Sequence, residues 1–145
     1  MQESVRDLNV TAHQVAISDQ AGELEFVSGA VSHVFTQAAK RNDYHFKQQV
    51  PARVRAQRLD ESGIEGDSLI IKIDVEGQEL KVLQGATGLF EADRVKAVYL
   101  DGYDDPGVEA FLVARGFDFF DGRTMRPTVS SFPNLLAVKA TKCRT

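Results

Sequence analysis

The clearest pattern along the chain is an apolar run that ends abruptly in acidic residues. Residues 69–77 read LIIKIDVEG, so four of the first five are apolar and Asp74 and Glu76 follow. A short run of this composition predicts a parallel strand that is covered on both faces. Apolar residues then recur at helical spacing over residues 79–90, with glycines that favour a break near Gly85. The two acids therefore lie where a central strand leads into a helix, the edge at which open α/β sheets bind ligands.

A second unit of strand and helix follows the first. Residues 95–101 predict a strand that also ends in an acid, and residues 108–115 predict a helix that Gly116 closes. The apolar segments 117–121 and 135–138 predict a closing antiparallel pair. Two consecutive units of strand and helix imply an α/β fold with a parallel core and right-handed crossovers.

The first half of the chain is less regular. Residues 9–18 predict a strand, and the alternation over residues 23–27 predicts a half-buried strand that forms a hairpin with it. Residues 50–59 alternate again and predict an edge or antiparallel strand. Residues 28–52 show little pattern, and basic residues predominate from Lys40 to Arg58. This stretch is interpreted either as a solvated loop or as a mobile lid over an anionic or polar substrate.

Composition narrows the picture only modestly. A chain of 145 residues with 43% hydrophobic and 26% charged residues is typical of one globular domain, so residues 1–145 are interpreted as a single domain. A net charge of -4 gives no general attraction to nucleic acid or to an anionic membrane. The single cysteine, Cys143, and the lack of a long apolar run or a signal peptide favour a soluble, cytoplasmic protein.

Three stretches, in order along the chain, carry a resemblance to a known family. Residues 72–86, KIDVEGQELKVLQGA, resemble the KIDVEG-x-E-x-x-VL-x-GA signature of FkbM-type S-adenosylmethionine-dependent methyltransferases. AISD at residues 16–19, followed by GELEF at residues 22–26, is similar to the strand and hairpin that precede this signature. RLD at residues 58–60 resembles the T/R-LD element just before it. The resemblance runs from residue 9 to about residue 100.

The resemblance implies a Rossmann-like methyltransferase sheet, mixed but mostly parallel, that ends in the antiparallel pair described above. It also implies S-adenosylmethionine as the cofactor. The implied reaction is O-methylation of a hydroxyl on a small molecule, typically a sugar or a natural product. Methyl transfer depends mainly on proximity and alignment, so few strictly chemical residues are expected.

Candidate site residues follow from the positions that match the family's signature. Asp74 would lie beside the methionine part of the cofactor and the methyl acceptor, and Glu76 would orient the acceptor or the neighbouring loop, which makes both candidate catalytic residues. A carboxylate near a sulfonium stabilises its positive charge and can accept the proton of a hydroxyl. Ala16 and Ile17 would line the adenine side, so the cofactor-binding candidates are Ala16, Ile17 and Asp74. Alternatively, the acids serve only as caps of the following helix.

Asp101 and Tyr103 are the candidate substrate-binding residues, because they lie where the second parallel strand ends and can face the acceptor pocket. The alternative for Asp101 is a role in the turn that it forms with Gly102. Mg²⁺ held by Asp74, Glu76 and Asp101 would instead indicate a different α/β enzyme. No metal site is assigned from the sequence.

The sequence departs from the family in one respect. Such methyltransferases begin with a strand that ends in a D/E-x-G-x-x-x-G turn, followed by a strand whose terminal acid binds the ribose, and neither element is present. Two adjacent strands of the sheet would then be lacking, and the strand at residues 69–74 would expose an unpaired edge. The chain is therefore interpreted as roughly the C-terminal two thirds of a methyltransferase domain, truncated and unable to bind the cofactor fully alone.

The unpaired edge allows several arrangements. It stays exposed in a fragment of a longer enzyme, it pairs with residues 9–18 or 50–58 to close the gap, or it forms a homodimer with a second copy. The alternative to an enzyme is a catalytically inactive interaction module, which presents residues 28–52 or the open edge to a partner.

Overall fold

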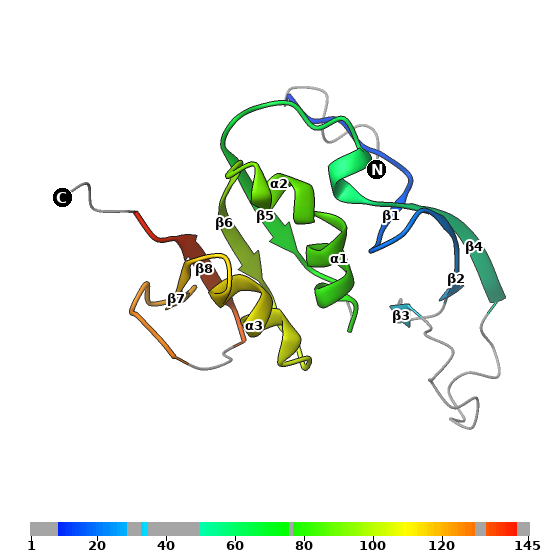
Figure 1. Cartoon of the computed structure of the whole chain (residues 1–145). Helices are drawn as coiled ribbons and strands as arrows, with labels where there is room; N and C mark the ends of the chain where they lie inside the picture. The colour runs from blue at the N-terminus through cyan, green and yellow to red at the C-terminus, as the bar shows by residue number, and fades with distance from the viewer. Residues whose placement is uncertain (1–8, 29–32, 35–49, 76, 130–132, 142–145) are drawn as a thin grey trace.

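The chain forms an α/β structure with two mixed β-sheets (Figure 1). The computed structural model describes residues 9–28, 33–34, 50–75, 77–129 and 133–141. Within these residues each sheet has four strands, and three α-helices accompany the second sheet. The predicted α/β class is confirmed, but the prediction of one mostly parallel sheet is wrong for the described residues. Their strands form two sheets, and in each sheet one of the three strand pairs is parallel and two are antiparallel.

The second half of the chain builds the sheet that carries the predicted motif. Its strands are β5 (Leu69–Ile73), β6 (Val95–Leu100), β7 (Phe117–Asp121) and β8 (Leu135–Lys139), in the order β5-β6-β8-β7. β5 and β6 are parallel, and β8 runs antiparallel to both of its neighbours, β6 and β7. The predicted parallel pair and the predicted closing antiparallel pair are therefore both confirmed.

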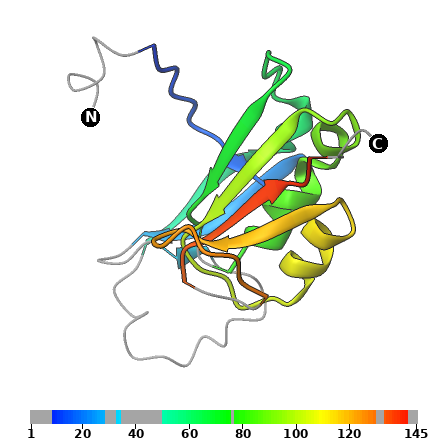
Figure 2. The ribbon, with the colours of Figure 1, turned by 90° about the vertical axis from the view of Figure 1, so that its left-hand side faces the viewer.

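Three helices lie on one face of this sheet (Figures 1 and 2). They are α1 (Glu79–Gly85), α2 (Thr87–Glu91) and α3 (Gly107–Val113), so the predicted break near Gly85 is confirmed. The connection from β5 to β6 and the connection from β6 to β7 both move along the sheet in the same direction. Because such crossovers are right-handed, the helices within these connections lie on the same face. The core beneath the helices includes side chains with no exposed surface: Leu83, Val98, Leu100, Val108, Leu112 and Leu135.

The opposite face of β5 is open at Ile70 within the part of the chain that the structure describes. Ile73 belongs to the core and is 3% exposed, whereas Ile70 is 79% exposed. The prediction that this strand is covered on both faces is therefore wrong for the described residues, because the helices pack on one side only (Figure 2). An apolar run such as LIIKI is compatible with a strand covered on one face as well as with one covered on both.

The first half of the chain forms the other sheet, from β1 (Ala16–Ile17), β2 (Gly22–Ser28), β3 (His33–Val34) and β4 (Val50–Gln57). The strand order is β1-β4-β2-β3, with β1 parallel and β2 antiparallel to β4. The strand predicted over residues 9–18 is thus only two residues long. Its predicted hairpin with β2 is wrong, because β1 pairs with β4 instead. β4 is antiparallel to β2, as one of the alternatives predicted, but it lies inside the sheet and not at its edge.

The space beside β5 is not closed by strand pairing. Among the described strands β5 lies at the end of its sheet, and neither β1 nor β4 forms a ladder with it. The arrangement in which residues 9–18 or 50–58 pair with this edge is therefore wrong. The prediction of a lid or a solvated loop concerns residues 28–52, most of which lie outside the described residues.

Candidate functional site

The carboxyl end of β5 leads into α1 through a sharp turn at Gly77. This residue has a φ of 72°, in the left-handed region that glycine adopts without the steric cost of a side chain. Its amide donates a 3.0 Å hydrogen bond to Oε1 of Glu79, the first residue of α1, which is 3% exposed. The Glu79 side chain therefore stabilises the turn. The side chain of Asp74, at the start of the turn, is 59% exposed.

Asp74 forms an ion pair with Lys72, two residues earlier in the chain. Nζ of Lys72 donates to Oδ2 of Asp74 at 2.6 Å, and both side chains are more than half exposed. This hydrogen bond is the main reason that the pKa of Lys72 lies above its usual value. The lysine in an otherwise apolar strand is thereby paired with the candidate catalytic residue.

A cavity of about 420 Å³, here called the first cavity, is lined by both halves of the chain. Ala16 and Ile17 contribute from β1, Asp74 from the end of β5, and Val82 from α1. The lining is mainly apolar, and the Lys72–Asp74 ion pair is its charged part. The structure thus brings the three cofactor-binding candidates, Ala16, Ile17 and Asp74, to the same cavity.

A second cavity of about 280 Å³ adjoins the first, because Asp74 and Val75 line both. Asp101 and Tyr103, the candidate substrate-binding residues, also line the second cavity, together with Asp104. The second cavity is therefore polar and acidic where the first is apolar. Asp74 is the candidate catalytic residue that the two cavities share.

Tyr103 and Asp101 are held differently at the second cavity. The Tyr103 hydroxyl donates to Oε1 of Glu109 at 2.7 Å. Burial, and then this carboxylate, raises the pKa of Tyr103 well above its usual value, so the phenol is neutral at physiological pH. The backbone amide of Asp101 donates to the carbonyl oxygen of Ile73, and its own carbonyl accepts from Asn134. These bonds fix Asp101 at the strand end, as a turn role requires, and the residue still lines the cavity.

Two further predictions concern metal ions and membranes. Among the described residues, no group of three or more His, Cys, Asp or Glu side chains is placed to hold a metal ion. Glu76, a catalytic candidate and one of the three carboxylates considered for Mg²⁺, lies outside the described residues. No helix in the described part of the chain is long and apolar enough to cross a membrane.

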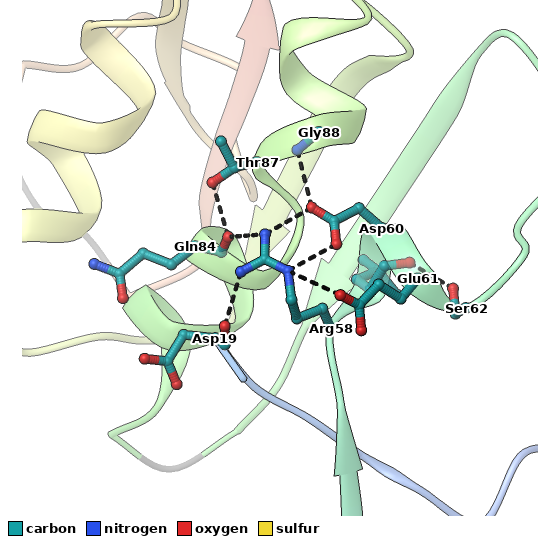
Figure 3. Close-up of polar contacts among 9 residues, drawn as sticks. Asp19, Arg58, Asp60, Glu61, Ser62, Gln84, Thr87 and Gly88 are labelled. Carbon is teal, nitrogen blue, oxygen red and sulfur yellow. Dashed lines mark hydrogen bonds and ion pairs between the residues drawn. The ribbon is translucent and has the colours of Figure 1, made fainter. Parts of the chain in front are cut away.

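Sequence reasoning missed a polar cluster centred on Arg58, which directly follows β4 (Figure 3). Its Nη1 donates at 2.8 Å to the carbonyl oxygen of Asp19, two residues beyond β1. Its Nε and Nη2 bind the two carboxylate oxygens of Asp60 at 3.0 and 2.8 Å. Nη2 also donates at 3.3 Å to the carbonyl oxygen of Gln84, near the end of α1. The guanidinium therefore reaches the first sheet and the first helix at once.

Asp60 extends the cluster to α2. Its Oδ2 accepts a 3.0 Å hydrogen bond from the amide of Gly88, in the first turn of α2, where Ala86 at the N-cap offers no capping side chain. The hydrogen bond from Arg58 is the main cause that holds the pKa of Asp60 below its usual value. The RLD motif marked both residues, but the partners Asp19 and Gln84 bind through backbone carbonyls, which leave no trace in a sequence.

Replacing Asp60 with asparagine is expected to lower the free energy of unfolding by about 1–3 kcal/mol at neutral pH, because Arg58 and the Gly88 amide lose a charged acceptor. The lowered pKa of Asp60 means that its stabilisation is complete above about pH 4 and is lost as the pH falls through the folded-state pKa. The difference between wild type and Asp60→Asn should therefore shrink in acid. Urea unfolding from about pH 7 to about pH 2.5 measures it.

The matched control for this prediction is Glu61→Gln. Oε1 of Glu61 lies 3.8 Å from Nε of Arg58, but its side chain is 58% exposed, so a change of less than about 0.5 kcal/mol is expected. A difference between Asp60→Asn and wild type that stays constant down to low pH would contradict the assigned role of the carboxylate.

Comparison with known proteins gives one result. A family model described as the methyltransferase FkbM domain matches residues 2–119, which is more than half of the chain. Neither the curated proteins nor the solved structures contain a significant match.

Proposed function

The chain belongs to the FkbM methyltransferase family, and from this premise we propose that its site serves the transfer of a methyl group from S-adenosylmethionine to a hydroxyl oxygen of a small molecule such as a sugar or a natural product. The observation that carries the proposal is the position of Asp74, which lines both an apolar cavity and an acidic one. One cavity suits the cofactor, and the other suits a hydroxyl-bearing acceptor.

The first cavity has the size and the chemistry for the cofactor. Its volume of about 420 Å³ lies within the range of about 300–1,000 Å³ that is usual for small-molecule sites. Ile17 and Val82 supply apolar surface for a flat base. The Lys72–Asp74 ion pair offers one group of each charge, which matches the ammonium and the carboxylate of an amino acid. S-adenosylmethionine would supply a methyl group on a positively charged sulfur.

Asp74 would stabilise the positive charge of the cofactor and orient the hydroxyl group of the acceptor. A carboxylate stabilises a nearby positive charge and can orient a hydroxyl or accept its proton. Asp101 in the second cavity offers a further acceptor for hydroxyl groups of the substrate, while the hydroxyl of Tyr103 already donates to Glu109. For Glu76, the family resemblance implies a role in orienting the acceptor, and we propose the same role here. Most of the rate enhancement would come from alignment of the two reactants.

The residues present supply only part of a cofactor site. The sequence holds no D/E-x-G-x-x-x-G turn, which in related methyltransferases lets the backbone approach the cofactor closely. We therefore expect the 145-residue chain to bind S-adenosylmethionine with a Kd weaker than about 100 µM, instead of the low-micromolar affinity of a complete site. Isothermal titration calorimetry measures this affinity. A low-micromolar Kd would contradict the incomplete site.

An NMR titration tests where the ligand binds. Excess S-adenosylmethionine is expected to shift the amide resonances of Ala16, Ile17 and Val75 and to leave those of β7 unchanged. Adenosine alone should reproduce the shifts in β1, and methionine alone those near Asp74. Shifts confined to other parts of the chain, or none at all, would contradict the proposal.

S-adenosylhomocysteine is the matched ligand control, because it lacks the positive charge on sulfur. Wild type is expected to favour S-adenosylmethionine over it, and Asp74→Asn should reduce this preference, since the variant keeps the shape of the side chain without its charge. An unchanged preference would show that Asp74 does not face the sulfonium.

A second candidate function is that of an interaction module which binds through β5. It is favoured by the position of β5 at the end of its sheet and by the exposure of Ile70. Sedimentation velocity over a wide concentration range tests the homodimer version, and Ile70→Lys should weaken such a dimer. A monomer at every concentration would exclude it.

A further inference from the structure

We infer that Arg58 is a positioning residue of the first cavity. It holds the part of the lining that β1 contributes (Ala16 and Ile17, here called the β1 wall) against the junction of α1 and α2. Ala16 and Ile17 thereby face Asp74. This role rests on the proposed function for its link to the cofactor, but the positioning itself can be measured without any ligand. It follows from the contacts of Arg58, from the helix ends that it meets, and from the backbone approach at Gly85.

The contacts of Arg58 join segments that are far apart in the sequence. Its partners Asp19 and Gln84 are 39 and 26 residues away, and both bind through carbonyl oxygens (Figure 3). A planar guanidinium can serve Asp60 and these two carbonyls together because its donors point in fixed, divergent directions. A lysine ammonium at the same place is a single point charge and cannot reach all of them.

The charges of the Arg58–Asp60 pair match the helix ends that they touch. Arg58 lies at the carbonyl end of α1, through Gln84, and Asp60 lies at the amide end of α2, through Gly88. A positive group is favoured at the first kind of end and a negative group at the second. The break between the helices therefore creates the place at which one ion pair contacts both.

Backbone packing at Gly85 leaves little freedom between α1 and β1. A Cβ at Gly85 would lie 2.9 Å from the carbonyl carbon of Ser18 and would overlap its oxygen. Ser18 is 5% exposed, and its amide donates to the carbonyl of Gln57 in β4 at 3.0 Å. The residue after β1 is thus held between β4 and α1, and Arg58 binds the carbonyl oxygen of the next residue, Asp19.

Arg58 is separate from the main core. The core cluster of buried residues extends from Ile73 to Ala137 and belongs to the second sheet and its helices, with Ile17 and Leu59 packed against its border. Loss of Arg58 is therefore expected to release the β1 wall and to leave the second sheet folded. A role in global stability alone would affect both parts equally.

Hydrogen exchange of single amides tests the inference on the full chain. Arg58→Ala is expected to accelerate exchange of the Ser18 and Gly88 amides by about tenfold or more, with amides of β6 and β8 unchanged. Arg58→Lys should fall between this variant and wild type. The control is Arg53→Ala in β4, whose side chain is 71% exposed in ion pairs with Glu23 and Glu25, and which should leave the Ser18 amide unchanged.

Three results would overturn the inference. One is a Ser18 amide that exchanges as in wild type when Arg58 is replaced by alanine. Another is acceleration by the same factor in β6 and β8, which would show a loss of global stability only. The third is an Arg58→Ala variant in which hydrogen exchange of the Ser18 amide is accelerated but the affinity for adenosine is unchanged. If wild type shows no adenosine shifts at all, the proposed function fails, while the exchange data still decide whether Arg58 positions β1.

Discussion

Replacing Ile73 with alanine is expected to lower the free energy of unfolding by about 2–5 kcal/mol, whereas Ile70→Ala should change it by less than about 0.5 kcal/mol. The two isoleucines belong to the same strand, β5, and are 3% and 79% exposed. Ile73 packs in the core beneath the helices, so its truncation removes buried apolar surface and leaves a cavity. Ile70 lies on the open face, where truncation removes neither.

Urea unfolding of the two variants side by side measures this contrast. Both variants carry the same isoleucine-to-alanine change in the same strand, so the difference between their free energies of unfolding reports the difference in burial. A loss at Ile70 as large as the loss at Ile73 would contradict an open face and would mean that another surface covers β5 in solution. In that case the same measurement at several protein concentrations would separate a second copy from a cover within the chain.

Replacing Gly85 with alanine is expected to destabilise the chain by about 2–3 kcal/mol, although helix propensity alone argues for the opposite sign. Alanine is favoured over glycine by about 1 kcal/mol inside a helix. At Gly85 the added methyl would overlap the carbonyl oxygen of Ser18, which is backbone and cannot rotate away. Either α1 or the end of β1 must therefore move, and the first cavity, which both of them line, should lose its shape.

The matched control for Gly85→Ala is Gly102→Ala. No heavy atom lies within 4 Å of the place that a Cβ at Gly102 would take, so a change of less than about 0.5 kcal/mol is expected there. Thermal or urea unfolding gives the free energies, and the exchange rate of the Ser18 amide shows whether β1 has moved. A gain in stability for Gly85→Ala would show that α1 and β1 are not in backbone contact.

The second half of the fold was predictable because its signals are local. Apolar runs marked β6, β7 and β8, and the break between α1 and α2 was visible in the glycines. The cause of that break was not visible, since Gly85 is needed for the approach of Ser18, which is 67 residues earlier in the chain. The low helix propensity of glycine thus predicted the break correctly, and the packing of Ser18 against Gly85 explains why a glycine is needed there.

The first half was predicted less well because its pairings are not local. β1 pairs with β4 and not with the neighbouring β2, and an alternating sequence cannot distinguish these partners. Residues 9–15 contain apolar positions but form no strand. Similarly, the LIIKI run of β5 did not reveal that Ile70 is exposed, because its apolar residues are the same whether one face or both are covered.

The positions of the candidate site residues were predictable where they depend on a motif or on a strand end. The signature located Asp74, and the strand ends located Asp101 and Tyr103, so that the structure finds all three on adjoining cavities. The role of Arg58 was not predictable, because it is defined by two carbonyl oxygens that any residue would provide. The distance between a motif residue and its backbone partners appears only when the chain is folded.

The division of the chain into two sheets also affects its folding during synthesis. Strands β1 to β4 leave the ribosome before α1, whose Gly85 packs against Ser18 and whose Gln84 accepts a hydrogen bond from Arg58. At about 5–20 residues per second, the stretch from Gln57 to Gly88 takes roughly 2–6 s to translate. During this time the first sheet has neither the backbone of Gly85 nor the carbonyl of Gln84 to pack against. The part of the cavity that is synthesised first therefore cannot dock until α1 has been made.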